Sequence, residues 1–413
     1  MVETSRDRLP AEDSGFRFAR RMAAMTQSGL RDLMARASRP GVISFAVGLP
    51  AAELFPVREL ALASARVLPA DPGALQYAVP HAPLKRQIVD LMAMRGIDCR
   101  PEQVFLTSGS QQAMDLLARL FLDPGGEVML EETVYDGAQM AVKLLAPSIV
   151  TLPTGAAHGL DVAAAGRLLA GGARPAFLYA IPSCHNPLGV SLAPERRREL
   201  VELARSFRLP ILEDDAYGFL DYGEVPPPPL RALDDRWVLY LGSFSKILAP
   251  GLRAGWIVVP EDLVPRLSAL KHATDLDTPS FSHHLISAYL DRGGFAAHLE
   301  RLCREYARRR DAMLAALAAS FPPEVRWSRP AGGMFIWVEL PASADATDLL
   351  ELALANESVA FSPGVAFAVG GARHAAHCFR LCFTALPGER IEAGIRRLAR
   401  AVAAYLGQLS RTA

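Results

Sequence analysis

Short apolar runs alternate with longer segments of helical periodicity through the middle of the chain. The runs span four to six residues, whereas the segments between them repeat apolar side chains every three or four positions. Strands separated by helices in this way are typical of an α/β fold with a mostly parallel sheet. Seven strands are predicted, at residues 104–107, 127–130, 149–152, 176–181, 210–213, 237–241 and 255–259.

The helical periodicity predicts helices at residues 112–121 and 194–207, and one long helix at 281–317. A further helix, from Ala19 to Met34, is expected to end before Pro40-Gly41, which disfavours its continuation. The last hundred residues alternate strand-like and helical segments and indicate a smaller module of mixed structure. Its predicted elements are residues 333–339, 346–355, 378–383 and 388–406.

Chain length and charge narrow the classes of protein that fit this pattern. At 413 residues the chain is too long for one ordinary core, so a large and a smaller domain are expected. Lysine plus arginine equals aspartate plus glutamate, at 44 each, which gives no indication of a nucleic-acid or anionic-membrane partner. The arginines of residues 301–310 alternate with acidic and apolar residues, so we interpret them as a solvated helix face.

The cysteines and apolar runs argue for a cytoplasmic protein. The five cysteines are odd in number and lack the tight spacing of a metal site, so we expect reduced thiols and no metal. The N-terminus is polar, without the apolar core of a secretory signal. No apolar run reaches the ~18 residues that a membrane-spanning helix needs, so no membrane association is expected.

In a parallel α/β sheet, the ligand site lies beyond the carboxyl ends of the strands. Ser110 and Gln111 follow the strand at 104–107 in a small-residue loop that opens a helix, where free N–H groups attract an anion. The alternative is that Ser110 is an ordinary N-cap. Tyr135 and Asn186 follow two further strands, the second within a turn sequence.

Two more strand ends carry charged groups. Glu213, Asp214 and Asp215 lie together at the end of one strand, where burial would require a cationic partner, and a structural pair with arginine is the simplest explanation. Hydroxyl and cationic side chains follow the next strand, a combination that suits a phosphate. These side chains are Ser243, Ser245, Lys246 and Arg253.

Taken together, these motifs resemble those of the class I/II aminotransferases of pyridoxal 5′-phosphate (PLP) fold type I. The chain is most similar to the 2-aminoadipate and kynurenine aminotransferase branch, from about Ser28 to its end. The motifs that carry the resemblance are Ser243-Phe244-Ser245-Lys246 with Arg253, Asp214-Asp215-Ala216-Tyr217, Asn186-Pro187-Leu188-Gly189, Gly48-Leu49-Pro50, Gly332-Gly333-Met334-Phe335 and Phe379-Arg380-Leu381.

The resemblance implies a role for each site residue. Lys246 would hold PLP as a Schiff base, and its freed amine would take the substrate Cα proton. Asp214 would pair with the pyridine nitrogen, which keeps the ring an electron sink. Asn186 and Tyr217 would bind the ring oxygen, and Tyr135 would stack on the ring. The phosphate would be held by Ser110, Gln111, Ser243, Ser245 and Arg253, and the substrate by Arg380, Asn186 and Gly48.

The family also implies a domain organisation and a partner. The large PLP-binding domain, with a seven-stranded, mostly parallel sheet flanked by helices, would be joined by a smaller α+β domain. The expected segments are a flexible N-terminus at 1–15, a small-domain segment at 16–56, the large domain at 57–300 and the small domain at 301–413. A homodimer with shared active sites is implied, in which Tyr77 reaches the phosphate of the neighbouring subunit.

The expected function is a PLP-dependent aminotransferase acting on an L-amino acid and a 2-oxo acid. The chain departs from the family in the loop 78–83, which is about two residues short, and at His185, which replaces glutamine or asparagine. Another PLP-dependent reaction, such as decarboxylation, γ-replacement, cyclisation or oxidation, therefore stays open. A non-catalytic ligand-sensing domain is disfavoured, because only about 40 residues precede Val42.

Overall fold

The computed structural model describes residues 16–412 except 20, 23–24, 26–32, 34–35, 38, 78–79, 224–225 and 372. The N-terminus at 1–15 lies outside the described residues, as does most of the helix predicted from Ala19 to Met34. Among the described residues, no helix combines the length and apolar character required to cross a bilayer.

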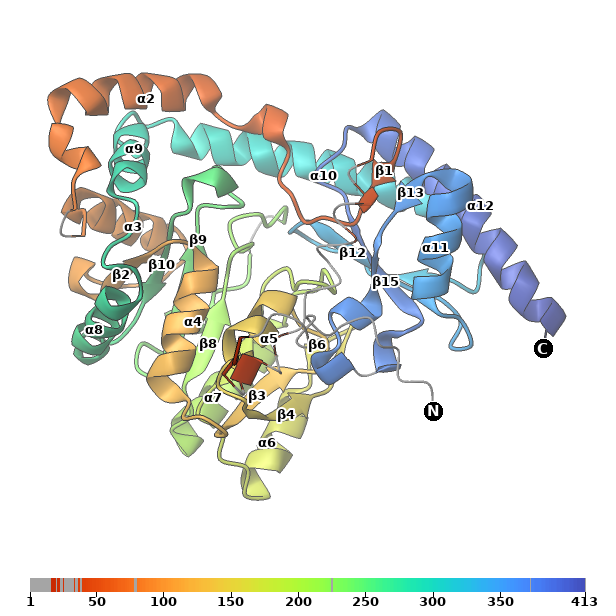
Figure 1. Ribbon diagram of the computed structural model, residues 1–413, viewed down its shortest axis with the longest axis horizontal. Helices are drawn as coiled ribbons and strands as arrows, with labels where there is room; N and C mark the ends of the chain where they lie inside the picture. Colours follow the sequence, from red (N-terminus) through yellow and green to blue (C-terminus); the bar gives the residue numbers. More distant parts are fainter. Residues whose placement is uncertain are drawn as a thin grey trace.

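A seven-stranded sheet forms the centre of the larger part of the molecule (Figure 1). All of its neighbouring pairs are parallel except those of β10, which is antiparallel to both β2 and β9. The predicted mostly parallel sheet is therefore confirmed. Its strands, in spatial order, are β2 (Val104–Thr107), β10 (Gly255–Val258), β9 (Val238–Ser243), β8 (Ile211–Asp214), β7 (Leu178–Ala180), β3 (Glu127–Glu131) and β4 (Ser148–Leu152).

Helices cover both faces of this sheet, which explains why its strands read as continuous apolar runs. In β3, Val128 and Leu130 pack with one set of helices, whereas Met129 between them packs with the other. The first set is α4 (Ser110–Phe121), α5 (Asp136–Lys143) and α8 (Val264–Asp275). The second set is α6 (Val162–Ala170) and α7 (Pro194–Phe207).

The C-terminal part of the chain builds a separate four-stranded antiparallel sheet in the order β11-β12-β15-β14. Early residues join this region, because β1 pairs in parallel with β13 (Figure 1). The strands are β1 (Ile43–Ser44), β11 (Arg326–Trp327), β12 (Phe335–Glu339), β13 (Val359–Ala360), β14 (Ser362–Pro363) and β15 (Cys378–Cys382). The accompanying helices are α11 (Ala346–Glu357) and α12 (Gly388–Thr412).

The single long helix predicted at 281–317 is wrong. The chain forms α9 (Ser280–Leu290) and α10 (Phe295–Ser320), separated by a turn. Gly293 in that turn has φ +74°, a conformation that ends a helix and that glycine adopts without strain. α9 packs on α2 (Val57–Ala70) and α3 (Ala82–Met94), whereas α10 packs along α12 (Figure 1).

The solvated face predicted for residues 301–310 is wrong at Arg309. Its guanidinium is buried and donates to the Thr384 carbonyl at 2.5 Å, to Glu53 at 2.6 Å and to Glu305 at 2.8 Å. Arg308, one residue earlier, is exposed and pairs with Glu305 alone in the described structure. Arg309 thus ties the long helix to the N-terminal segment and to the turn after β15.

We expect Arg309→Met to lower the free energy of unfolding by about 2 kcal/mol, because the buried Thr384 carbonyl would lose its charged donor. Urea unfolding followed by circular dichroism measures this. Arg308→Met is the matched control and should leave the transition midpoint unchanged, since that side chain is exposed. Equal midpoints for the two variants would show that the buried contacts are not stabilising.

Candidate active site

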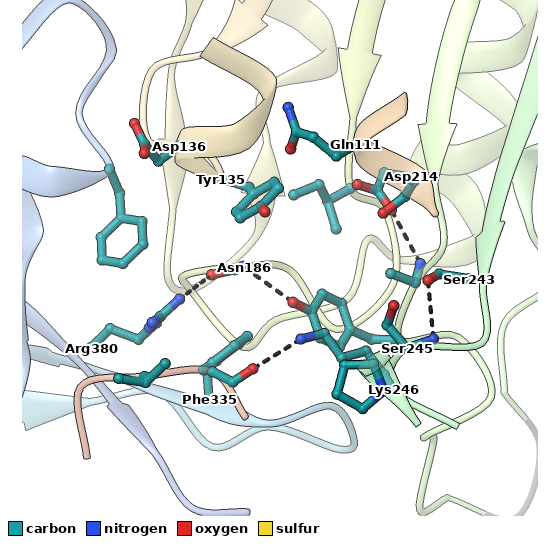
Figure 2. Close-up of a pocket in the computed structure, with 18 of the residues that line it drawn as sticks. Gln111, Tyr135, Asp136, Asn186, Asp214, Ser243, Ser245, Lys246, Phe335 and Arg380 are labelled. Atoms are coloured by element: carbon teal, nitrogen blue, oxygen red, sulfur yellow. Dashed lines mark hydrogen bonds between the residues drawn. The ribbon is translucent and has the colours of Figure 1, made fainter. Parts of the chain in front are cut away.

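A cavity of about 260 Å³ lies at the carboxyl edge of the sheet, between the large sheet and the C-terminal module (Figure 2). All of the predicted site residues line it except Tyr77. These residues lie at the ends of strands, at the starts of helices and in the N-terminal segment. The predicted residues in the lining are Gly48, Ser110, Gln111, Tyr135, Asn186, Asp214, Tyr217, Ser243, Ser245, Lys246, Arg253 and Arg380.

One end of the cavity has the features of an anion site. The N-cap of α4 is Gly109, with φ +99°, and Ser110 is the first helical residue and caps nothing, so the alternative of Ser110 as N-cap is wrong. The first N–H groups of α4 therefore open toward the cavity with the positive end of the helix dipole. The φ of +99° favours glycine at position 109, and a Cβ there would also lie 3.0 Å from the Arg253 guanidinium.

Arg253 supplies the positive charge of this end. Its Nη2 donates to the Ser108 carbonyl at 2.9 Å, and no carboxylate meets it among the described residues. Ser243 accepts the Ser245 N–H at 3.1 Å, which places both hydroxyls on the same turn. Hydroxyls, a guanidinium and helix N–H groups are the donors that a phosphate needs, so this end fits the phosphate of PLP.

The three neighbouring acids have three different environments. Glu213 accepts the N–H groups of Leu230 and Arg231, and burial raises its pKa to about 7. Asp215 accepts from Arg95 at 3.0 Å and from a tyrosine, so the arginine pairing suggested for these acids holds for Asp215. Asp214 alone of the three lines the cavity.

Tyr179 is a site residue that the sequence did not reveal. Its hydroxyl donates to Asp214 Oδ2 at 2.7 Å, and the Ala216 N–H donates to Oδ1 at 3.2 Å. Burial raises the pKa of the Asp214 carboxyl and these two donors oppose the shift. The two residues lie on adjacent strands, and nothing in the local pattern of residues 176–181 indicates which partner a tyrosine there would reach.

Lys246 presents its amine to the centre of the cavity (Figure 2). Nζ donates to the Gly48 carbonyl at 2.9 Å. Burial lowers the pKa of Lys246 to about 8, and Arg380 and Arg253 add to the effect. At pH 7 roughly a tenth of the amine is therefore neutral, far more than for an ordinary lysine, and a nucleophile or a base must be neutral.

Arg380 is a buried cation that meets no carboxylate among the described residues. Nη1 donates to Asn186 Oδ1 at 2.7 Å, and Nη2 donates to the Ala46 carbonyl at 2.8 Å. The third nitrogen, Nε, has no hydrogen-bond partner among the described residues. The guanidinium lies 4.2 Å from the centroid of the Phe335 ring and 4.6 Å from that of Phe367. A carboxylate ligand would complete this environment.

The Asn186 side chain forms hydrogen bonds to both Arg380 and Tyr217. Its amide oxygen accepts from Arg380, and its Nδ2 donates to the Tyr217 hydroxyl at 3.2 Å (Figure 2). His185, the departure noted in the sequence, does not line the cavity: Nδ1 accepts the Leu188 N–H, and Nε2 lies 2.9 Å from Glu131. His185 is therefore a buried structural residue behind the Asn186 turn.

Tyr77 lies apart from this cavity. Its side chain is 80% exposed and borders a separate surface cavity of about 620 Å³, lined also by residues 277–281. Within one subunit it therefore reaches none of the site residues.

A lysine, a carboxylate and an unmatched arginine lining one cavity at the edge of an α/β sheet are the groups typical of an enzyme that binds a carbonyl cofactor. A family model for class I and II aminotransferases matches residues 40–398. The 2-aminoadipate transaminase of Thermus thermophilus is 41% identical, over 94% of this chain and 97% of its own length. Aromatic-amino-acid aminotransferase 1 of Thermococcus litoralis is 37% identical over 93% and 94%.

A solved structure of an α-aminoadipate aminotransferase from Thermus thermophilus, complexed with N-(5′-phosphopyridoxyl)-L-leucine, superposes with a TM-score of 0.88. It is 40% identical and covers 95% of this chain and 98% of its own. The chain belongs to the class I and II aminotransferase family. It is a PLP-dependent aminotransferase of fold type I, as the sequence predicted.

The lowered pKa of Lys246 predicts a pH profile for its reactivity. In protein freed of cofactor, acetylation of Lys246 by trace acetic anhydride should rise about tenfold per pH unit and level off above about pH 8, because the neutral amine reacts. Mass spectrometry of the Lys246 peptide measures the rate, with free Nα-acetyl-lysine as the internal control. A midpoint near the control's would contradict the lowered pKa.

Proposed function

We propose that the twelve predicted residues in the cavity lining bind PLP and substrate in the roles that the family resemblance implies. The observation that carries this proposal is the convergence of Lys246, Asp214 and the unmatched Arg380 on one cavity. When bound, PLP supplies an electron sink that stabilises negative charge at the substrate Cα. Side chains of this protein would orient the cofactor, bind the substrate and transfer the proton.

Asp214 is placed to receive a protonated ring nitrogen, and a cation there would offset the burial that raises its pKa. Tyr179 and the Ala216 N–H fix the carboxylate orientation. Tyr135, largely enclosed at the start of α5, offers an aromatic face to the cavity (Figure 2). Tyr217 and Asn186 present polar groups for a ring oxygen.

Arg380 is the proposed receptor of the substrate α-carboxylate. Its guanidinium contacts two aromatic rings and donates to Asn186 and Ala46, so it is oriented before the ligand arrives. The similar proteins are named for 2-aminoadipate and for aromatic amino acids, and all of these compounds carry an α-carboxylate. The neutral Nζ of Lys246 then accepts the Cα proton of the bound amino acid, for which its pKa of about 8 is suited.

The proposed domain division has the boundaries predicted from the sequence, with residues 16–56 assigned to the small domain. The β1–β13 pairing supports that assignment. A cytoplasmic location is also proposed, and the five cysteines, all unpaired, agree with a reducing compartment. We propose no nucleic-acid or membrane partner. The equal number of acidic and basic side chains supports this proposal, because it gives no net charge to attract an anionic partner.

A homodimer with shared active sites is the proposed assembly. Leu75 and Tyr77 are large apolar side chains exposed by 70% and 80% beside the surface cavity of about 620 Å³. Such exposure at a hollow surface is typical of a subunit interface. Tyr77 of the partner subunit would then complete the phosphate site.

We expect Lys246→Ala to abolish the absorbance of covalently attached PLP and to lower turnover at least about a thousandfold, because both nucleophile and base are lost. Pyridoxamine phosphate formation from an amino donor is followed by absorbance, and 2-oxo acid should reverse it. Lys143→Ala, on the far end of α5, is the control and should behave as the wild type. Retained transamination in Lys246→Ala would rule out the assignment.

Mixing two variants tests the shared site. Tyr77→Phe should weaken PLP binding about threefold to tenfold through the lost hydroxyl. Mixed dimers of Tyr77→Phe and Lys246→Ala subunits contain one complete site, so activity at limiting PLP should exceed the sum of the separate variants. If subunits exchange and no activity is gained, Tyr77 does not act across the interface.

A further inference from the structure

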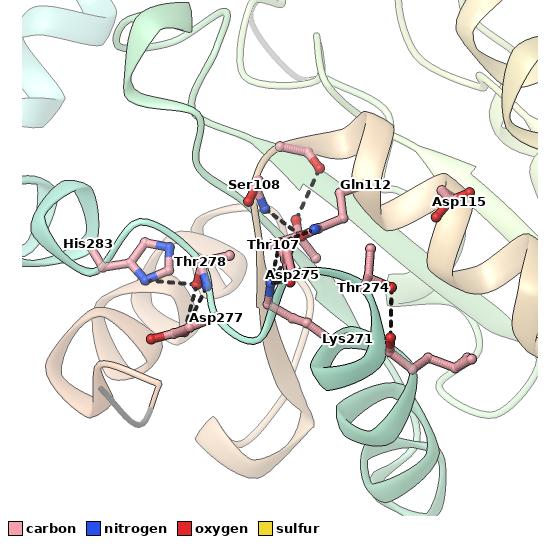
Figure 3. A network of polar contacts seen from close by, with 12 residues as sticks. Thr107, Ser108, Gln112, Asp115, Lys271, Thr274, Asp275, Asp277, Thr278 and His283 are labelled. Atoms are coloured by element: carbon pink, nitrogen blue, oxygen red, sulfur yellow. Dashed lines mark hydrogen bonds and ion pairs between the residues drawn. The ribbon is translucent and has the colours of Figure 1, made fainter. Parts of the chain in front are cut away.

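Behind the anion end of the cavity, a second polar network joins α4 to the end of α8 (Figure 3). Its central residue is Gln112, which follows Gln111 but does not line the cavity. Gln112 contacts the loop Ser108-Gly109 on one side and the residues Lys271 and Asp275 on the other. The network therefore lies directly behind the proposed phosphate site.

The backbone of Ser108 is held by hydrogen bonds at both its N–H and its carbonyl. Its N–H donates to Gln112 Oε1 at 2.9 Å, and its carbonyl accepts from Arg253 Nη2 at 2.9 Å. The loop that opens α4 is thus fixed by Gln112, and the same loop fixes the direction of the Arg253 guanidinium. A change at Gln112 would reach Arg253 through the backbone of one residue, Ser108.

The orientation of the Gln112 amide is determined by its charged neighbours. Nε2 donates to Asp275 Oδ2 at 2.5 Å, and Lys271 Nζ donates to Oε1 at 3.3 Å. A carboxylate can only accept and an ammonium can only donate, so the amide oxygen must point toward Ser108. Lys271 is buried and pairs with Asp275 at 2.8 Å, which makes this orientation costly to change.

We propose that Gln112, Lys271 and Asp275 are positioning residues for the cofactor phosphate. They hold the Ser108 peptide, and through it Arg253, in the geometry that the phosphate needs. The inference rests on the proposed function, because it takes the Ser110 and Arg253 end of the cavity as the phosphate site. It adds three residues that touch neither cofactor nor substrate.

The test compares two aldehydes that differ only in the phosphate, PLP and pyridoxal. Gln112→Met keeps the length of the side chain and removes its hydrogen bonds to Ser108, Lys271 and Asp275. The dissociation constant for PLP should rise about threefold to tenfold, as expected for loss of one or two hydrogen bonds, while that for pyridoxal stays the same. Absorbance titration of cofactor-free protein measures both.

A matched control lies on the same two helices. Asp115 pairs with Arg119, which donates to Thr274 of α8, so this contact also joins α4 to α8. Figure 3 shows Asp115 on α4, away from the Ser108 loop. Asp115→Asn should leave the ratio of PLP to pyridoxal affinity as in the wild type. A variant that merely loosens helix packing would instead weaken both ligands together.

A double variant that combines Gln112→Glu with Asp275→Asn provides the rescue. It exchanges the amide and the carboxylate, so the new carboxylate at position 112 still accepts from Ser108 while Lys271 keeps one acidic partner. Each single substitution should raise the PLP dissociation constant, and the double variant should restore it to within about twofold of the wild type.

An unchanged ratio of PLP to pyridoxal affinity in Gln112→Met would overturn the inference, whether neither ligand is weakened or both are weakened equally. These outcomes are separate from failure of the proposed function. That failure would show as wild-type protein unable to bind PLP, or as attachment that survives Lys246→Ala.

Discussion

The guanidinium of Arg380 is buried between two aromatic rings and reaches only neutral oxygens in the described structure. Removing a cation from water is costly, and burial lowers the pKa of this arginine. Its neighbours come from distant segments: Ala46 from the N-terminal region, Asn186 from the large sheet and Phe367 from the C-terminal module. The site therefore requires both parts of the molecule to meet, and the substrate carboxylate that we propose for Arg380 would supply the missing negative charge.

The cost of removing a charge from water also explains why the other charged side chains of the site have different roles. Asp215 is matched by Arg95 and stabilises the fold, whereas Asp214 receives only neutral donors and stays available to a cation. Lys246 meets a carbonyl rather than a carboxylate, so burial shifts its pKa toward neutrality. A buried charged side chain that has no counter-charge within the protein remains available to bind a ligand or to react.

The seven strands were predictable because both faces of the sheet are buried, so each strand is a short apolar run bounded by turn residues. The long helix at 281–317 was predicted without its break, because helical periodicity resumes on both sides of Gly293. Arg309 resembled its exposed neighbours in sequence, and its burial depends on Glu53 and Thr384, which are distant along the chain.

The sequence by itself determined the fold class, the lysine that we propose as the catalytic base and the order of the strand-end motifs. These depend on local periodicity and on short spacings, which adjacent residues specify. Only the tertiary structure decided that Asp214 rather than its neighbours faces the cavity, that Tyr179 supports it, that Ser110 is not a cap and that Gln112 stands behind the phosphate loop. Each of these depends on which strands and helices lie side by side, and pairing between distant segments leaves no trace in a local pattern.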